Sequence, residues 1–236
     1  MAFIDAALLP LISAGIGAGA GSLGATLLGD ALKRKSERRL LREKLVNNYL
    51  LQLQDAVESL WGRLINKGAL LALKETTDPY FERSTLYALA CLLAYNRILL
   101  LDGVYSQIEI FRPGLGVALR KKLQQVEFSL DAEIPGAGFY RYNRIALAET
   151  VMERVEGRWI IKGYLEFNNR YEKIEIQKAL IPAKSFVLQV SNSKLDSLLK
   201  DLMDIAIDVG KVTGITPSIQ EIAEMRLKDQ QKADPW

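Results

Sequence analysis

The chain has 236 residues, of which 49% are hydrophobic and 25% charged, a globular balance that excludes a disordered or collagen-like chain. It contains no histidine and one cysteine, Cys91. These counts exclude Ser-His and Cys-His catalytic pairs, histidine metal ligands and an internal disulfide. The formal net charge of +3 is too small to predict nucleic-acid binding by itself.

The first feature along the chain is an uncharged run of 24 residues, from Ala6 to Gly29. As a helix it would span about 36 Å, more than the roughly 30 Å core of a bilayer. We therefore predict a transmembrane helix over residues 1–30. Three alternatives stay open: a cleaved secretory signal, a buried helix of a soluble protein, and a dinucleotide-binding loop at Gly19–Gly24, which matches GxGxxG.

Small residues recur every four positions within this run. At about 100° per residue they form one stripe, and such stripes let helices approach closely inside lipid. The stripe predicts homo-oligomerisation, with a pore or ring as one form of the assembly and a simple anchor as the alternative. Its members are Ser13, Gly17, Gly21, Ala25 and Gly29.

A basic segment follows directly, at residues 31–44. Between Lys33 and Lys44 seven cations face two glutamates, a formal +5. The positive-inside rule then predicts a single-pass protein of the inner (cell) membrane, with the N-terminus outside and the body in the cytoplasm. We expect the segment to contact anionic lipid headgroups, and nucleic acid is the less favoured partner. The cations concerned are Lys33, Arg34, Lys35, Arg38, Arg39 and Arg42.

The body, residues 45–228, is predicted to be an all-α bundle ahead of a polar tail at 229–236. A long amphipathic helix runs from Asp30 to Lys74 and continues the membrane helix as a stalk. The next helix starts at Pro79 and runs to residue 111 as a buried core helix. Two helices are predicted at Leu115–Leu130 and Tyr140–Val155, with a loop at Pro135–Gly138 between them and a helix stop at Gly157. A helix at Tyr164–Lys178 and an extended stretch at Phe186–Val190 follow. The last two elements are a helix capped by Ser193 and closed by Gly210 or Gly214, and a helix that begins at Pro217.

No catalytic set emerges from the residues, and we expect neither enzyme activity nor a cofactor or metal. Glu149 and Glu153 share a predicted helical face, which indicates a solvated surface. Glu82 and Arg83 near a helix start are predicted to serve the helix dipole. Cys91 is predicted to be a buried small hydrophobe.

One stretch mixes aromatic and basic side chains, Phe139-Tyr-Arg-Tyr-Asn-Arg144. Nucleic-acid surfaces have this composition. Its position at a loop-to-helix start favours a structural interpretation. We expect the aromatic side chains to be buried and the arginines to point outward.

Two blocks carry a resemblance, Glu82–Tyr95 (ERSTLYALACLLAY) and Tyr140–Glu149 (YRYNRIALAE). Over about residues 35–210 the chain resembles a family of uncharacterised bacterial and fungal membrane-anchored helical proteins. Tyr140 and Asn143 depart from the family pattern, which has a tryptophan and an acid there. The resemblance implies a membrane-anchored helical fold, and it carries no function or catalytic residue over to this chain.

The layout of one membrane helix before a helical body also resembles the ring-forming membrane accessory proteins of antiviral defence systems, several of which have a HEPN-like body. Without histidine this chain lacks the HEPN nuclease pair. The expected function is thus a non-enzymatic membrane-anchored homo-oligomer, a pore or a ring. The alternatives are a membrane-tethered adaptor whose helical body binds a cytosolic protein, and a carboxylate-based enzyme at the membrane face.

Overall fold

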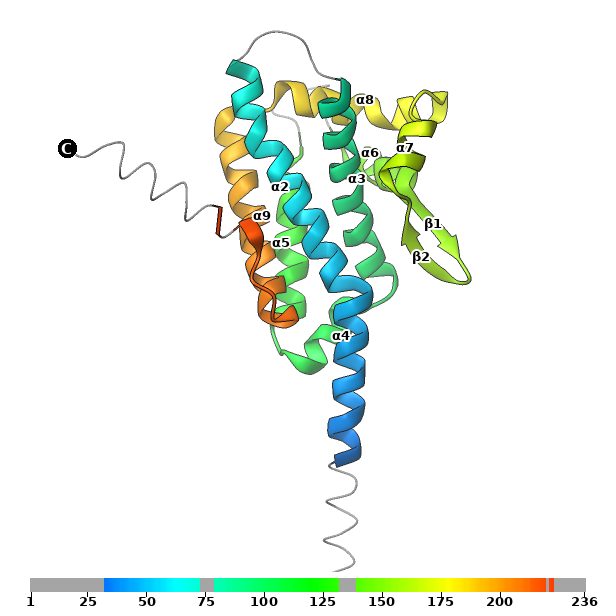
Figure 1. Ribbon diagram of the computed structural model, residues 1–236, viewed down its shortest axis with the longest axis vertical. Helices are drawn as coiled ribbons and strands as arrows, with labels where there is room; N and C mark the ends of the chain where they lie inside the picture. Colours follow the sequence, from blue (N-terminus) through cyan, green and yellow to red (C-terminus); the bar gives the residue numbers. More distant parts are fainter. Residues whose placement is uncertain (1–31, 73–78, 132–138, 220, 223–236) are drawn as a thin grey trace, which may run out of the picture. The chain divides into compact units, whose positions relative to one another are not determined.

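The computed structural model describes residues 32–72, 79–131, 139–219 and 221–222 (Figure 1). The chain divides into two units, Met1–Lys44 and Leu45–Trp236. In the first unit, residues 32–44 are helical and every side chain except Leu41 is exposed. The predicted membrane helix, its stripe of small residues, the Pro135–Gly138 loop and the tail lie outside the described residues.

The second unit begins with a π-helical turn, η1 (Val46–Leu50), which leads into α2 (Leu51–Ala72). The amide of Leu51 donates to the Val46 carbonyl, the i+5 bond that defines this turn. The wider turn brings Leu45 and Leu50, five residues apart, into the same buried core. The five-residue spacing between these two leucines is the feature of the sequence that indicates this turn.

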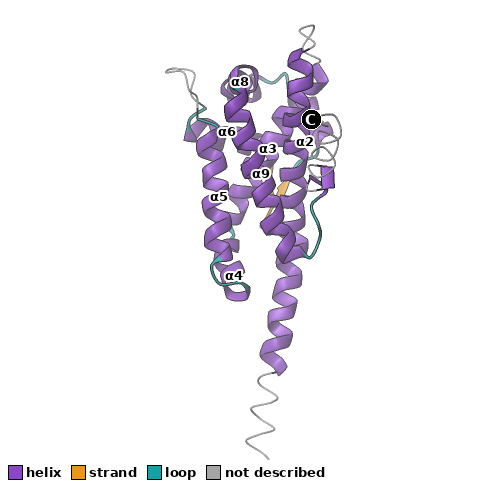
Figure 2. Ribbon diagram, turned by 90° about the vertical axis from the view of Figure 1, so that its left-hand side faces the viewer, coloured by secondary structure: helices purple, strands orange, loops and turns teal. Residues whose placement is uncertain are grey.

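Four helices form the main bundle: α2, α3 (Pro79–Leu101), α5 (Leu115–Ser129) and α9 (Asn192–Thr213). α2 packs against both α3 and α9, and α9 packs in turn against α5 (Figures 1 and 2). The shared core is mostly leucine, with Leu53, Leu89 and Leu202 at 2% exposure or less. Burial of these apolar faces is what holds the helices together.

Four further helices of the described residues lie around this bundle: α4 (Val104–Phe111), α6 (Arg141–Val151), α7 (Tyr164–Arg170) and α8 (Ile174–Gln189). α6 packs against α3 on one side and α8 on the other. α4 and α8 lie at opposite ends of the bundle in both views (Figures 1 and 2).

The prediction of a buried core helix beginning at Pro79 is confirmed. α3 is the one helix of the described ranges that is long and apolar enough to cross a membrane, and 67% of that stretch is buried within the protein. The helix ends earlier than the predicted residue 111. Gly103, at a φ of 64°, interrupts it before α4 begins.

The predicted helix at Tyr140–Val155 is too long, because its last four residues form a strand. β1 (Met152–Val155) pairs antiparallel with β2 (Arg158–Ile161). Glu156 and Gly157 both have positive φ, 49° and 80°, as a two-residue hairpin turn requires. Gly157, interpreted as a helix stop, is therefore the second residue of this turn.

The extended stretch predicted at Phe186–Val190 is also wrong, because α8 runs through Pro182 to Gln189. Ala183, Phe186 and Val187 lie at helical spacing and are all buried. Burial of this face outweighs the strand preference of the local sequence. α9 ends at Gly214, one of the two glycines predicted to close it, but Ser191, two residues before the predicted Ser193, caps its start.

Candidate functional site

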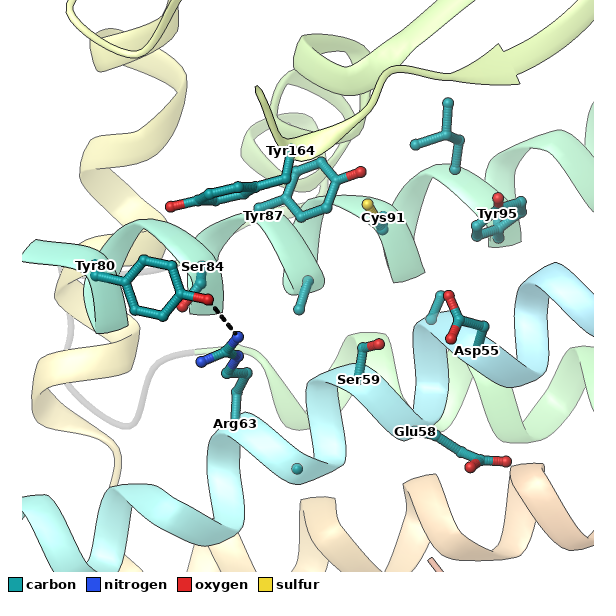
Figure 3. Close-up of a pocket in the computed structure, with 14 residues that line it drawn as sticks. Asp55, Glu58, Ser59, Arg63, Tyr80, Ser84, Tyr87, Cys91, Tyr95 and Tyr164 are labelled. Atoms are coloured by element: carbon teal, nitrogen blue, oxygen red, sulfur yellow. Dashed lines mark hydrogen bonds between the residues drawn. The ribbon is translucent and has the colours of Figure 1, made fainter. Parts of the chain in front are cut away.

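One cavity of the described part has a volume of about 560 Å³ and lies where α2, α3, β2 and α7 meet (Figure 3). α3 supplies Tyr80, Ser84, Tyr87, Cys91 and Tyr95. α2 supplies Asp55, Ser59 and Arg63 on the facing side. Ile161 of β2 and Tyr164 of α7 close the cavity from above. We call it the tyrosine pocket.

Helical spacing explains the α3 wall. Its five residues follow one another at steps of four, three, four and four, so they share one face of the helix. Sequence reasoning missed this site because the leucines of α3 dominated the pattern. The polar and aromatic stripe between those leucines was the signal.

The aromatic side chains of the pocket brace one another. The Tyr164 ring stands edge-on to Tyr87, with ring centroids 5.4 Å apart, and to Tyr80 at 6.1 Å. The Tyr87 hydroxyl donates a 2.8 Å hydrogen bond to the Lys162 carbonyl, next to the hairpin. These contacts fix the rings as one wall.

The two ends of the pocket carry opposite charges. At one end Arg63 lies 5.3 Å from the centroid of the Tyr80 ring and donates to the Tyr80 hydroxyl at 3.3 Å. At the other end Asp55 faces Cys91 and Tyr95 across the space between α2 and α3 (Figure 3). Burial, with a contribution from the Asp55 charge, raises the pKa of Cys91 to about 12 and that of Tyr95 to about 12.

Several polar side chains of the pocket have no protein partner among the described residues, and two of them, Asp55 and Ser59, are exposed to solvent. Within the described ranges, Asp55 forms no ion pair, and neither the Ser59 nor the Tyr95 hydroxyl is hydrogen-bonded. Glu58 differs, because it points away from α3 in Figure 3 and accepts hydrogen bonds from Gln54 and Ser218. The open groups therefore gather at the Asp55 end.

A second cavity, of about 490 Å³, lies beside α5 and the start of α6, and a buried arginine adjoins it. Arg144 is 6% exposed, donates to the Phe139 carbonyl at 2.8 Å and pairs with Asp131. Its Nε lies 3.8 Å from Glu127. We call this group, with Asn96 and Tyr105 beside it, the Arg144 cluster.

The prediction for residues 139–144 was half wrong. Phe139 is buried as expected, but Tyr140 and Tyr142 are 57% and 82% exposed. Arg144 points inward because Asp131 and Glu127, more than ten residues earlier, supply the charge that a buried guanidinium needs. Neither acid is close enough in sequence to have indicated this.

One further prediction is wrong, and the contacts of Glu82 go beyond the predicted one. Glu153 lies in β1 and shares no helical face with Glu149, which pairs with Arg97 at 3.0 Å. Glu82, besides lying in the first turn of α3, accepts from the Tyr171 hydroxyl at 2.7 Å and pairs with Lys184 at 3.1 Å.

Arg83 likewise contacts other helices. It pairs with Glu172 at 2.7 Å and lies 4.4 Å from the Tyr171 ring centroid. The prediction for Cys91 is confirmed, since it is buried at 7% exposure.

The predicted lipid-contacting cations all lie on exposed helical residues. Arg39 pairs with Glu43 at 2.9 Å, and both side chains stay open to solvent. The predicted oligomerisation residues, from Ser13 to Gly29, fall outside the described ranges. Across the part that the structure describes, no group of three acidic or cysteine side chains is placed to hold a metal ion.

Comparisons of the chain with protein-family models, with curated proteins and with solved structures gave no match in any of the three. The resemblance based on the two sequence blocks therefore stays a prediction. What the chain does has to be argued from its own charges and cavities.

Proposed function

We propose that this protein is a non-enzymatic, single-pass protein of the inner (cell) membrane that homo-oligomerises through residues 1–30. Residues 45–228 form its cytoplasmic helical bundle. The proposal combines the uncharged run, its small-residue stripe and the basic segment. The resemblance to membrane-anchored helical proteins agrees with it.

The observation that carries the proposal is the exposure of the basic helix. Leu32 and Leu40 are 66% and 63% exposed, and the cations around them are exposed as well. Apolar and basic side chains together suit the boundary between headgroups and acyl chains. Each cation near an anionic surface contributes about 1 kcal/mol, and salt screens that contribution.

The oligomer is tested by light scattering on the detergent-extracted full chain, with the detergent mass subtracted. We expect a discrete oligomer that Gly21→Leu dissociates, because a bulky side chain on the stripe separates the helices. Gly19→Leu, which places the same substitution about 160° around the helix from Gly21, is the matched control and should leave the mass unchanged. A monomeric full chain, or one that needs no detergent, would overturn the proposal. Bilayer conductance then distinguishes a pore from a closed ring.

Headgroup contact is tested with a chain that starts at Lys33, floated with anionic or zwitterionic vesicles. We expect binding to the anionic vesicles only, weakened by salt and by replacing Lys33, Arg34 and Lys35 with glutamine. The matched control replaces Lys173, Lys178 and Lys200, three exposed lysines of the body. Equal loss in both triple variants would show that the basic segment has no special role.

An adaptor is the second candidate, and one exposed group favours it. Leu100, Phe128 and Tyr140 are 53%, 65% and 57% exposed and all border the second cavity. Exposed aromatic and apolar side chains of this kind mark protein interfaces. If the adaptor is right, the chain from Lys33 stays monomeric and cross-links to a discrete cytosolic protein in cells, and Phe128→Ser removes the product.

A further inference from the structure

The tyrosine pocket has the size of a small-molecule site. Its volume of about 560 Å³ falls inside the range of roughly 300–1,000 Å³ that small-molecule sites occupy. Gly62 of α2 adds to the open space, because a Cβ on it would meet nothing within 4 Å. The cavity belongs entirely to the second unit and does not depend on the membrane segment.

Its walls attract cations. The face of a tyrosine ring is electron-rich, and this protein already uses that property, with Arg83 and Lys184 both lying over the Tyr171 ring. Inside the pocket Tyr80 is occupied in the same way by Arg63. No cation of the described residues lies over the rings of Tyr87, Tyr95 and Tyr164, so none of these rings is already paired with a positive charge. The Tyr87 ring also contacts the rings of Tyr164 and Phe167.

The negative charge at one end of the pocket favours a cation, as the tyrosine rings do. Asp55 supplies a carboxylate that no described side chain neutralises, and Ser59 and Tyr95 add hydroxyl oxygens beside it. The hydroxyls stay neutral near pH 7, because burial raises the pKa of Tyr95 to about 12. Asp55 is therefore the one source of negative charge that faces Cys91 and Tyr95.

Arg63 makes the end of the pocket opposite Asp55 positively charged. It lies eight residues after Asp55 on the same helix, a rise of about 12 Å. Its guanidinium is engaged with Tyr80, and its charge disfavours a second cation at that end. A ligand of one positive charge would be held with that charge at the Asp55 end and its apolar part along the rings.

We infer that the tyrosine pocket binds a small organic cation, an ammonium on an aromatic or aliphatic body, with the charge beside Asp55 and the body against Tyr87, Tyr95 and Tyr164. This inference does not rest on the proposed membrane function. It would hold for the same bundle whether or not residues 1–30 form an oligomer.

The test is calorimetric titration of the full chain in detergent with three probes of matched shape: phenethylammonium, 2-phenylethanol and phenylacetate. We expect saturable binding of the cation, binding of the neutral alcohol weaker by about tenfold or more, and no binding of the anion. Absence of saturable cation binding overturns the inference. Tighter binding of the anion overturns it as well, because Arg63 would then govern the site.

Three variants locate the binding. Asp55→Asn should weaken the cation by about tenfold and leave the neutral alcohol unchanged. Gly62→Leu should abolish binding of both probes, because its side chain would extend into the space beside Gly62, where a Cβ meets nothing within 4 Å. Asp196→Asn, an exposed acid on α9, is the matched control and should change nothing. If a folded Gly62→Leu protein binds the cation like the native chain, the site lies elsewhere.

Discussion

The Arg144 cluster and the tyrosine pocket are two polar groups in one bundle, and they differ in how many of their polar atoms have partners. In the cluster Arg144 is shared among Asp131, Glu127 and the Phe139 carbonyl, and the Tyr105 hydroxyl donates to Asn96 at 2.5 Å. In the pocket, within the described ranges, Asp55, Ser59 and the Tyr95 hydroxyl have none.

The difference separates a structural role from a recognition role. A buried charge that is paired with opposite charges holds elements together, and its removal leaves a costly unpaired partner. Arg144 is paired in this way, although its buried Nε has no hydrogen-bond partner among the described residues. An open polar group contributes little to folding and is free to bind a ligand. The two regions should thus respond oppositely to mutation: the cluster in stability, the pocket in binding.

The largest expected effect comes from breaking the cluster at its centre. Arg144→Ala leaves Asp131 and Glu127 without their cation and should reduce the free energy of unfolding by about 3–5 kcal/mol. Arg141→Ala, an exposed neighbour on the same helix, should change it by less than about 0.5 kcal/mol. Urea unfolding followed by circular dichroism measures both. Equal, small losses would mean that the cluster is not structural.

The sequence predicted the bundle better than it predicted these two regions. Helix boundaries were right at Pro79, at Leu115 and at Gly214, because proline fixes the backbone of a first turn and glycine readily adopts the left-handed conformation found at Gly114 and Gly214. The hairpin at Met152–Ile161 was missed, since its turn, Glu156-Gly157, lacks the usual Asn or Asp and follows a helical pattern without a break.

The sites depend on contacts between distant residues. Arg144 points inward only because Glu127 and Asp131 lie beside it in space, and Tyr164 reaches the α3 wall only after the unpredicted hairpin. Neither contact is marked in the sequence by a periodic pattern or a motif. The stripe of Tyr80, Tyr87 and Tyr95 was readable in the sequence, but a facing helix was needed to make it a pocket.

A third polar group, around Glu82, is paired like the Arg144 cluster but lies closer to solvent. Burial disfavours the charge of Glu82, but hydrogen bonds from Tyr171 and Lys184 outweigh burial and lower the pKa of Glu82 below its usual value of 4.5. A lowered pKa stabilises the folded state above about pH 4.5, and this contribution is lost as the pH falls further.

Glu82→Gln should therefore reduce the free energy of unfolding by about 1.5–3 kcal/mol at pH 7 and by less at pH 3. Parallel urea titrations at the two values of pH measure the difference. Glu149→Gln, which breaks a more exposed pair, should cost less than about 1 kcal/mol. A constant difference between native and Glu82→Gln proteins across this range would contradict the assigned hydrogen bonds.

Two tyrosine-to-phenylalanine substitutions test the same difference, with a smaller expected change in the free energy of unfolding. Tyr105→Phe removes the hydrogen bond to Asn96 in the cluster and should lower the free energy of unfolding by about 0.5–1.5 kcal/mol. Tyr95→Phe removes a hydroxyl that has no partner among the described residues, so stability should be nearly unchanged. Thermal unfolding of the two variants compares them directly. Similar losses would show that the Tyr95 hydroxyl is engaged and is not open to a ligand.

The smallest effect is expected at Cys91, the thiol of the pocket wall. Burial raises its pKa to about 12, and the Asp55 charge adds to the rise, so alkylation by iodoacetamide at pH 8 should be slow in the folded chain. Asp55→Asn removes that charge and should speed alkylation by a few fold, to at most about tenfold. Asp196→Asn should not change the rate. Mass spectrometry of timed samples counts the label on the only cysteine of the chain. An unchanged rate in Asp55→Asn would mean that the carboxylate does not face the interior of the pocket, and the preference for cations would lose its electrostatic basis.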